Sequence, residues 1–252
     1  MAKLFLSLFL FQLQTLILFS QERIATDRPD QTETSDLAPP HYFQAEFGFG
    51  KESLDKEHYS LIHPTALFKY GFSKRFELRL ETNYVTAYEQ VIIPSKTITG
   101  FEPIRVGFKT ALWEEKNLIP KTSLLVHFGI PALATKIFKA THVAPSFLLA
   151  MQNSVTAHIT VSYNAGLEWD GFSSTPSWLY SLSSGYELGK RWEAFFEIFG
   201  AVQKDELAQN SLDAGFGFYV NNNVKLDAAA GVGISHSAAD YFFGIGISFR
   251  FH

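Results

Sequence analysis

The stretch YFFGIGISFRFH, residues 241–252, decides the fold class, because its side chains change character at every position. One face holds apolar side chains throughout: Tyr241, Phe243, Ile245, Ile247, Phe249 and Phe251. The other face starts with Phe242 and is otherwise small or charged: Gly244, Gly246, Ser248, Arg250 and His252. A period of two is the period of a β-strand. Because chain ends are usually polar and frayed, so regular a strand at the end of the chain indicates that it is paired.

The same alternation recurs along the chain from residue 41 onward. In KRFELRLETNY (74–84), Leu78 and Leu80 alternate with Glu77, Arg79 and Glu81. About twelve segments of roughly nine to fifteen residues show the pattern, which is the reach of a tilted membrane-spanning strand with some overhang. Their centres lie near Ala45, Pro64, Leu80, Val106, Leu125, Phe147, Val161, Leu182, Phe196, Gly215, Ala228 and Ile245. Pro64 and Pro145 fall inside the second and sixth segments and predict bulges or short strands there.

The connections between these segments alternate in length. GFSK (71–74), ELGKR (187–191) and VNNNV (220–224) are tight polar turns, whereas linkers such as VTAYEQVIIPSKTI (85–98) are longer. Short turns at one end and longer loops at the other are typical of an outer-membrane barrel. With the N-terminus in the periplasm, an even number of strands returns the C-terminus to the periplasm.

Aromatic residues near the segment ends suit the interfacial girdles of such a barrel. They are Tyr84, Tyr88, Trp113, Trp169, Trp178, Tyr186, Trp192 and Tyr241. A soluble β-sandwich or a lipocalin-like barrel also alternates, but its apolar face points inward and its charges point outward. The sequence therefore predicts an all-β fold, a closed antiparallel transmembrane β-barrel of about twelve strands in the bacterial outer membrane, with both termini periplasmic.

The chain divides into three parts. MAKLFLSLFLFQLQTLILFS (1–20) has one early lysine, an apolar stretch and a terminal small residue, as a cleaved signal peptide does; an N-terminal anchor helix is the alternative. Residues 21–40 form a periplasmic N-terminal segment and candidate lumen plug, and residues 41–252 form the barrel. The formal net charge of -4 indicates no nucleic-acid partner. The absence of cysteine excludes disulfides and thiolate sites.

Two stretches resemble a known family. IATDRPDQTETSDLAPPHYFQAEFGF (24–49) and LFKYGFSKRFELRLETNY (67–84) are similar to the opening segment and second hairpin of the MetA-pathway-of-phenol-degradation proteins, often labelled "transporter" in Bacteroidetes. The resemblance implies an outer-membrane β-barrel for export or uptake of small solutes, aromatic or hydrophobic ones among them, and brings no catalytic residues. Phe249 and Phe251 also resemble the C-terminal signal that the barrel-assembly machinery reads. The expected partners are this machinery, outer-membrane lipid and a small-molecule solute.

The N-terminal segment holds the first candidate site. TDRPDQTE (26–33) places Asp27, Arg28, Asp30 and Glu33 within eight residues. One interpretation is a plug that pairs with carboxylates and cations of the barrel lumen and narrows the pore. The other is a solvated leader between the signal peptide and the first strand.

Charged residues on the polar face of the strands are the second candidate site. The predicted lumen-lining residues are Glu46, Lys69, Glu77, Arg79, Glu81, Arg105, Lys109, Glu168, Glu187, Asp213, Lys225, Asp227 and Arg250, with Glu193 and Glu197 beside them. As a selectivity lining they would favour small polar or cationic solutes. Alternatively they form a structural ladder of cross-strand ion pairs, which the mixed signs on adjacent strands favour.

An enzyme is the least favoured class. Outer-membrane phospholipases are barrels of similar size with a Ser-His-Asn site, and this chain offers His127, His142 and His158 with Ser123, Ser146, Ser162 and Asn164. No motif fixes a serine beside a histidine with a third orienting group, and no spacing predicts a metal site or a cofactor. Three hypotheses follow: a channel or transporter, a plugged barrel without transport, and a lipid hydrolase. The family resemblance favours the channel over the plugged barrel.

Overall fold

The computed structural model describes residues 22–89 and 96–252. The predicted signal peptide, residues 1–20, lies outside the described residues. The strands are β1 (Phe43–Ser53), β2 (His58–Ser73), β3 (Phe76–Glu89), β4 (Lys96–Phe101), β5 (Ile104–Trp113), β6 (Lys121–Ile130), β7 (Ala144–Thr156), β8 (Ile159–Glu168), β9 (Ser177–Leu188), β10 (Trp192–Gln203), β11 (Gln209–Asn221), β12 (Val224–Gly233) and β13 (Tyr241–Phe251). Two single-turn 3-10 helices, η1 (Pro131–Leu133) and η2 (Lys136–Phe138), lie between β6 and β7.

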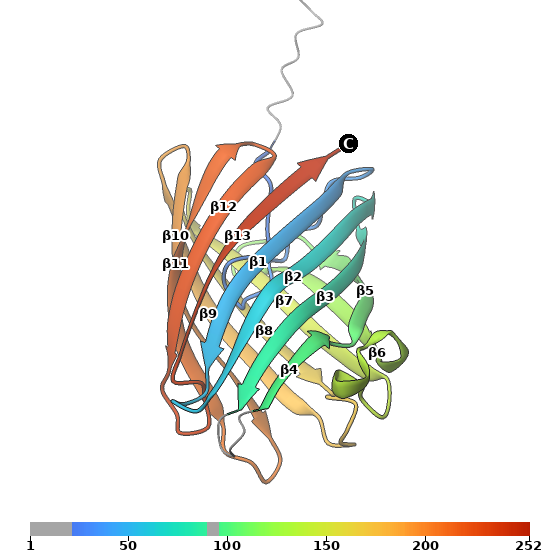
Figure 1. Ribbon diagram of the computed structural model, residues 1–252. Helices are drawn as coiled ribbons and strands as arrows, with labels where there is room; N and C mark the ends of the chain where they lie inside the picture. Colours follow the sequence, from blue (N-terminus) through green and yellow to red (C-terminus); the bar gives the residue numbers. More distant parts are fainter. Residues whose placement is uncertain (1–21, 90–95) are drawn as a thin grey trace, which may run out of the picture.

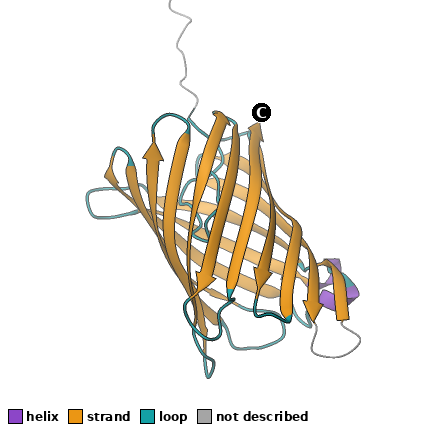
Figure 2. Ribbon diagram, turned by 60° about the vertical axis from the view of Figure 1, so that its left-hand side comes forward, coloured by secondary structure: helices purple, strands orange, loops and turns teal. Residues whose placement is uncertain are grey.

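The strands form one closed antiparallel barrel (Figures 1 and 2). Except for β4 and β5, which both pair with β3, each strand pairs with its sequence neighbours. β13 pairs with β1 along its whole length, from Phe43 opposite Phe251 to Ser53 opposite Tyr241. Closure satisfies the backbone groups that an open sheet would leave bare in hydrocarbon. The paired chain end that the last strand predicts is therefore confirmed.

The barrel has twelve strand positions, because β4 and β5 share one of them. β5 pairs with the first half of β3, and β4 pairs with its second half, from Tyr84 to Glu89. Glu102 and Pro103 separate the two strands, and proline cannot donate a ladder hydrogen bond. Beyond this break β4 contacts η2, where Thr135 N donates to Phe101 O at 3.0 Å. All twelve predicted centres lie in strands, but the predicted linker at 85–98 is wrong at both ends, because alternation continues to Glu89 and resumes at Lys96.

The two predicted proline irregularities have different outcomes. The β1–β2 and β2–β3 registers both shift around Pro64, so a bulge lies there as predicted. At Pro145 the bulge prediction is wrong, because β6 and β7 keep a regular register through Phe128 opposite Pro145. Pro145 is the second residue of a strand, a position at which a missing N–H is tolerated.

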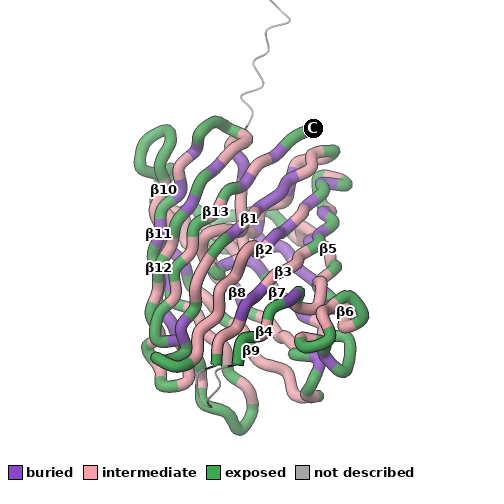
Figure 3. The backbone as a smooth tube through the Cα atoms, viewed as in Figure 1, coloured by how far each residue is buried: buried purple, intermediate pink, exposed green. Residues whose placement is uncertain are grey.

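The barrel is apolar outside and charged inside. On β3, Leu78 and Leu80 are 46% and 39% exposed, whereas Glu77 and Arg79 between them are buried. Figure 3 shows this alternation of exposed and buried positions along the strands. A soluble barrel has the opposite arrangement, so the soluble alternative is wrong. In the part of the chain that the structure describes, no helix combines the length and hydropathy needed to span a membrane.

The two ends of the barrel differ. The terminal end, uppermost in Figure 1, holds the start of β1, the end of β13 and the short connections β2–β3, β7–β8, β9–β10 and β11–β12. The loop end, opposite to it, holds longer connections, including residues 131–143 with both 3-10 helices. The predicted asymmetry between short turns and longer loops is confirmed except at two connections, the longer β5–β6 connection (114–120) at the terminal end and the short β1–β2 connection (54–57) at the loop end.

Candidate functional site: the occupied lumen

Residues 22–40, here called the N-terminal segment, run inside the barrel without regular secondary structure (Figure 2). At the terminal end, Arg250 Nη2 donates to Glu22 O at 2.7 Å, and Ile24 N donates to Asn222 O at 2.8 Å. Ala38 N donates to the Glu77 carboxylate before the chain turns into β1. An irregular backbone leaves its N–H and C=O groups open, and the charged inner wall supplies partners for them.

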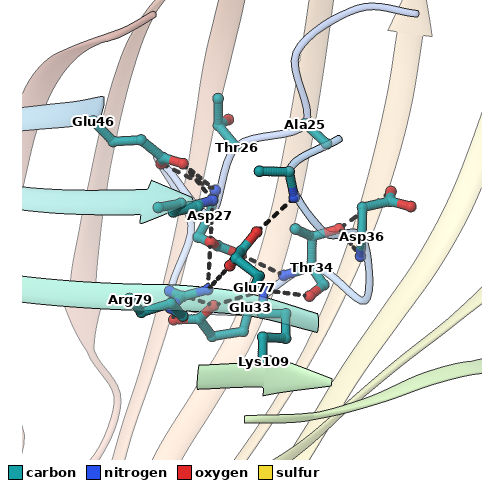
Figure 4. Close-up of polar contacts among 12 residues, drawn as sticks. Ala25, Thr26, Asp27, Glu33, Thr34, Asp36, Glu46, Glu77, Arg79 and Lys109 are labelled. Atoms are coloured by element: carbon teal, nitrogen blue, oxygen red, sulfur yellow. Dashed lines mark hydrogen bonds and ion pairs between the residues drawn. The ribbon is translucent and has the colours of Figure 1, made fainter. Parts of the chain in front are cut away.

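Asp27 is the centre of the contacts on the β1–β6 side of the lumen (Figure 4). Its carboxylate pairs with Lys69 of β2, with Arg79 Nη1 of β3 at 3.0 Å and with Lys109 Nζ of β5 at 3.0 Å. Thr34 N also donates to Asp27 Oδ1 at 3.1 Å, which folds the segment back on itself. Three neighbouring strands are thus joined to one side chain of the N-terminal segment.

Two further carboxylates complete this cluster. Glu33 Oε2 lies 3.1 Å from Arg79 Nη2 and 3.2 Å from Lys109 Nζ. Glu46 of β1 accepts hydrogen bonds from the backbone N–H groups of Asp27 at 3.1 Å and Arg28 at 3.2 Å. We call Asp27, Glu33, Glu46, Lys69, Glu77, Arg79 and Lys109 the ion cluster. Its opposite charges are close and well hydrogen-bonded, as buried ions require.

Electrostatics favour the ionised form of Asp27. Burial opposes ionisation of this carboxyl, but the positive charges of Lys109, Lys69 and Arg79 outweigh burial and hold its pKa well below the ordinary value of 3.8. Removing one partner from such a buried pair typically costs about 3–5 kcal/mol, because the remaining charges stay buried without compensation. The ion cluster therefore fixes one side of the N-terminal segment to the wall.

The side facing β8–β12 is held by fewer and more separate contacts. Arg28 Nη2 pairs with Asp227 Oδ1 at 3.0 Å, and Lys225 Nζ donates to Arg28 O at 2.9 Å. Gln31 N donates to Glu197 Oε2 at 2.8 Å. The side chain of Asn164 both accepts from Glu33 N at 2.7 Å and donates to Glu33 O at 3.0 Å.

Glycines make room for Arg28. A Cβ atom added to Gly48 of β1 or to Gly246 of β13 would collide with the Arg28 guanidinium. Small lumen-facing residues thus let this long side chain cross the bore between the N-terminal segment and β12.

Three cavities follow one another along the β8–β12 side. The loop-end cavity, about 370 Å³, and the middle cavity, about 180 Å³, share Arg28 and Pro29 in their linings. The middle cavity and the terminal-end cavity, about 750 Å³, share Ala25 and Tyr219. Residues of the N-terminal segment therefore lie between neighbouring cavities, Arg28 and Pro29 between the first two and Ala25 between the last two.

The structure places the predicted charged residues as follows. Glu46, Lys69, Glu77, Arg79 and Lys109 belong to the ion cluster. Further toward the loop end, Arg105 pairs with Glu81 at 3.8 Å and with Glu168 at 2.9 Å, so these three form a separate group. Glu187 pairs with Arg23 and Lys225 with Glu193, while Arg250 donates to Glu22 O.

The predicted plug residues Asp27, Arg28, Asp30 and Glu33 all contact the inner wall, Asp30 through Ser183 Oγ at 3.1 Å. The sequence prediction omitted uncharged partners of the segment, namely Gln44, Ser123, Ser181 and Ser183. Ser123 Oγ, for example, donates to Ser35 O at 2.7 Å. Strand alternation places such residues on the inner face, but only a known path for the segment shows which of them it meets.

The histidines and serines do not assemble a hydrolase site. Within residues 22–89 and 96–252, neither ring nitrogen of the buried His127 has a hydrogen-bond partner, although Ser146 lies opposite it in the β6–β7 register. His158 lies beside Glu187 at the terminal end. The described residues also contain no group of three or more acidic or histidine side chains arranged for a metal ion.

A closed antiparallel barrel with an apolar exterior and a charged inner wall defines the class of outer-membrane β-barrels. Residues 26–251 match the family described as "Putative MetA-pathway of phenol degradation", and the chain belongs to this family. Among curated proteins, none is significantly similar to the chain in sequence.

Solved outer-membrane barrels share the fold. The COG4313 outer membrane channel from Pseudomonas putida F1 has a TM-score of 0.68 and 9% identity, with 90% of this chain and 100% of that chain covered. The NanC porin has a TM-score of 0.56 and 9% identity, covering 82% and 98%. The KdgM porin has a TM-score of 0.55 and 13% identity, covering 83% and 99%. These relatives are channels and porins.

Proposed function

We propose that the protein is a passive outer-membrane channel in which the N-terminal segment narrows the route for small solutes, aromatic and hydrophobic ones among them. The observation that carries this proposal is the series of three cavities through the barrel. Neighbouring cavities share the lining residues Arg28 and Pro29, and Ala25 and Tyr219, and the proposal places the two constrictions of the route there. A solute moving between the two ends needs these two constrictions to widen, and needs no opening on the side of the ion cluster.

The lining of the route changes along its length. Phe199, Phe242 and Ala229 line the loop-end cavity, which suits an apolar solute. Ser162, Ser183 and Lys225 line the middle cavity, which is more polar. A route that begins apolar and becomes polar suits solutes with both characters, and the contacts of Arg28 with Asp227 at 3.0 Å control its narrowest part.

The same proposal includes the orientation of the barrel and its assembly. Short turns typically face the periplasm, so the terminal end, with the N-terminal segment and the end of β13, is placed there. β13 is then the strand that the barrel-assembly machinery reads, with Phe251 as its last outward aromatic. The proposal includes no catalytic role.

The test is conductance of the purified, refolded protein in planar bilayers, compared with a version lacking residues 21–40. The full chain should show small conductance steps, and the shortened chain larger ones. Heat-modifiable electrophoretic mobility should be the same for both, which controls for folding of the barrel. Uptake of a monosaccharide and of an amino acid into vesicles should increase in the same order. If a folded shortened barrel passes neither ions nor solutes, the protein is a structural barrel instead.

A further inference from the structure

Three carboxyl groups meet where the N-terminal segment passes β10 and β11. Glu197 of β10 and Asp213 of β11 lie directly opposite each other in the strand register, and Asp30 of the segment lies close enough to act electrostatically on both. Glu197 accepts hydrogen bonds from Gln31 N and from Thr32 Oγ1. These contacts explain the presence of Glu197, which holds the segment, but not that of Asp213.

Asp213 is buried, and the side chain in hydrogen-bonding contact with its carboxyl group is that of another acid, Glu197. The residue is only 3% exposed, and neither carboxylate oxygen has a hydrogen-bond donor among the described residues. A buried carboxylate without compensation is costly in the low dielectric of a protein interior. Asp213 also belongs to the lining of the loop-end cavity, although its carboxylate oxygens are covered, so a ligand in this cavity lies beside the residue.

The protein's own cations are used elsewhere. Arg28 pairs with Asp227, and Lys225 pairs with Glu193 and donates to Thr26 Oγ1 at 2.7 Å. Over residues 22–89 and 96–252, no lysine or arginine forms an ion pair with the three carboxyl groups, and no acidic cluster is arranged for a metal ion. The missing positive charge can come from a proton shared between Glu197 and Asp213 or from an organic cation in the adjoining cavity.

The cavity wall beside Asp213 suits such a cation. The rings of Phe199 and Phe242 point into the bore and pack edge to face with centroids 5.7 Å apart. Ala229 and Ala238 add small apolar surface. An aromatic face attracts ammonium groups as well as apolar bodies, and the cavity of about 370 Å³ lies in the size range of small-molecule sites.

We propose that the loop-end cavity binds small molecules with an apolar body and a protonated amine, whose ammonium group contacts Asp213 while the body lies against Phe199 and Phe242. This inference rests on the proposed channel function and names the chemical class of solute that the channel selects.

The experiment uses three probes that share a phenyl ring, namely 2-phenylethylamine, 2-phenylethanol and 3-phenylpropionate. Calorimetric titration of the full chain in detergent should give about ten- to a hundredfold tighter binding of the amine than of the alcohol, because a charge-assisted contact is made only by the amine. The carboxylate probe should bind most weakly. Calcium at the same concentration should not displace the amine.

Variants separate the contributions. Asp213→Asn should remove the preference for the amine and leave the binding of the alcohol unchanged. Phe199→Leu should weaken the amine and the alcohol alike. Glu52→Gln is the matched control, since Glu52 lines the same cavity but is exposed, and it should leave all three affinities unchanged. Because the probe series is measured on the unmodified chain, the preference can be tested even if a variant fails to fold.

Equal binding of amine and alcohol would overturn the inference, and the carboxyl groups would then share protons instead. Full retention of the amine preference in Asp213→Asn would also overturn it, because another group would then hold the ammonium. Displacement by calcium would also overturn it in favour of a metal site. Conductance of the same preparation separates a failure of the amine inference from a failure of the proposed channel function. Solute passage without amine preference contradicts only the inference, and amine preference without passage contradicts only the channel.

Discussion

At the scale of single residues, Asp27 has the largest effect on how the lumen is filled. Its carboxylate accepts from Lys69, Arg79 and Lys109, which lie on three different strands. Because Asp27 is buried, loss of its one negative charge would leave these three cations without a shared partner. Asp36 differs: it pairs with Lys121, and both side chains remain partly exposed. Solvent-exposed pairs of this kind contribute about 0–1 kcal/mol.

Asp27→Asn should therefore release the N-terminal segment, whereas Asp36→Asn should not. We expect a loss of about 3–5 kcal/mol of segment docking for Asp27→Asn, because three buried cations lose their shared partner. The absence of cysteine allows a direct measurement, since Ser35→Cys introduces a single thiol at a fully buried position. Its rate of reaction with a maleimide should rise strongly with Asp27→Asn and stay the same with Asp36→Asn. Equal rates in both backgrounds would show that Asp27 does not hold the segment.

At the scale of elements, the strands could be predicted from the sequence and the path of the N-terminal segment could not. Alternation assigns each residue of β3 and β13 to a face, because the period of a strand is two. The contact between Arg79 and Asp27 joins residues 52 positions apart, and one of them lies in a segment with no period at all. Such a partner depends on how the barrel closes and on where an irregular chain can satisfy its backbone groups. β4 was missed for another reason, because Glu102 and Pro103 divide one strand position into two.

The docking of the N-terminal segment should depend on pH through Asp30. Burial and the negative charge of Glu197 raise the pKa of Asp30 well above its ordinary value of 3.8. Above pH 3.8 the released carboxyl ionises while the docked one keeps its proton, so docking weakens as pH rises toward the raised pKa. The pKa of Asp27 is lowered in the docked segment, so its contribution to docking has the opposite dependence on pH. That contribution is fully present above pH 3.8, and it therefore stays constant as pH rises further.

We therefore expect the Ser35→Cys thiol to become more reactive from pH 5 to pH 8, after division by the rate of Ser174→Cys, which sits on an exposed loop. Burial also raises the pKa of Glu33 in the same segment, to about 7, and Glu197, Asp213 and Lys225 surround Asp30. The same series in Asp30→Asn is therefore needed to isolate the share of Asp30. Asparagine can still accept from Ser183 and mimics the protonated acid. The pH dependence should be smaller in Asp30→Asn, and an unchanged dependence would assign it to other groups.

At the scale of the whole molecule, the side to which the apolar face of each strand points decides whether the barrel is stable in a membrane. Leu182 lies at the middle of β9 on the outer face and is 50% exposed, while its neighbour Ser183 is buried in the lumen. Leu118 is 94% exposed but lies in the β5–β6 connection at the terminal end. Both are exposed leucines, yet only the first is placed to meet hydrocarbon if the barrel spans a bilayer.

Leu182→Lys should therefore lower the free energy of unfolding in lipid vesicles by about 2–4 kcal/mol, the cost of a lysine at the bilayer midplane on the lipid face of a barrel. Leu118→Lys should change it by no more than about 0.5 kcal/mol, because a loop leucine in water loses little on replacement. Urea titrations of both variants in vesicles give the comparison. Denaturation in detergent micelles, which adapt to a charge more readily than a bilayer does, should reduce the difference. Equal effects in vesicles would mean that the midpoint of β9 does not face lipid, and the outward apolar surface would then need a partner other than the membrane.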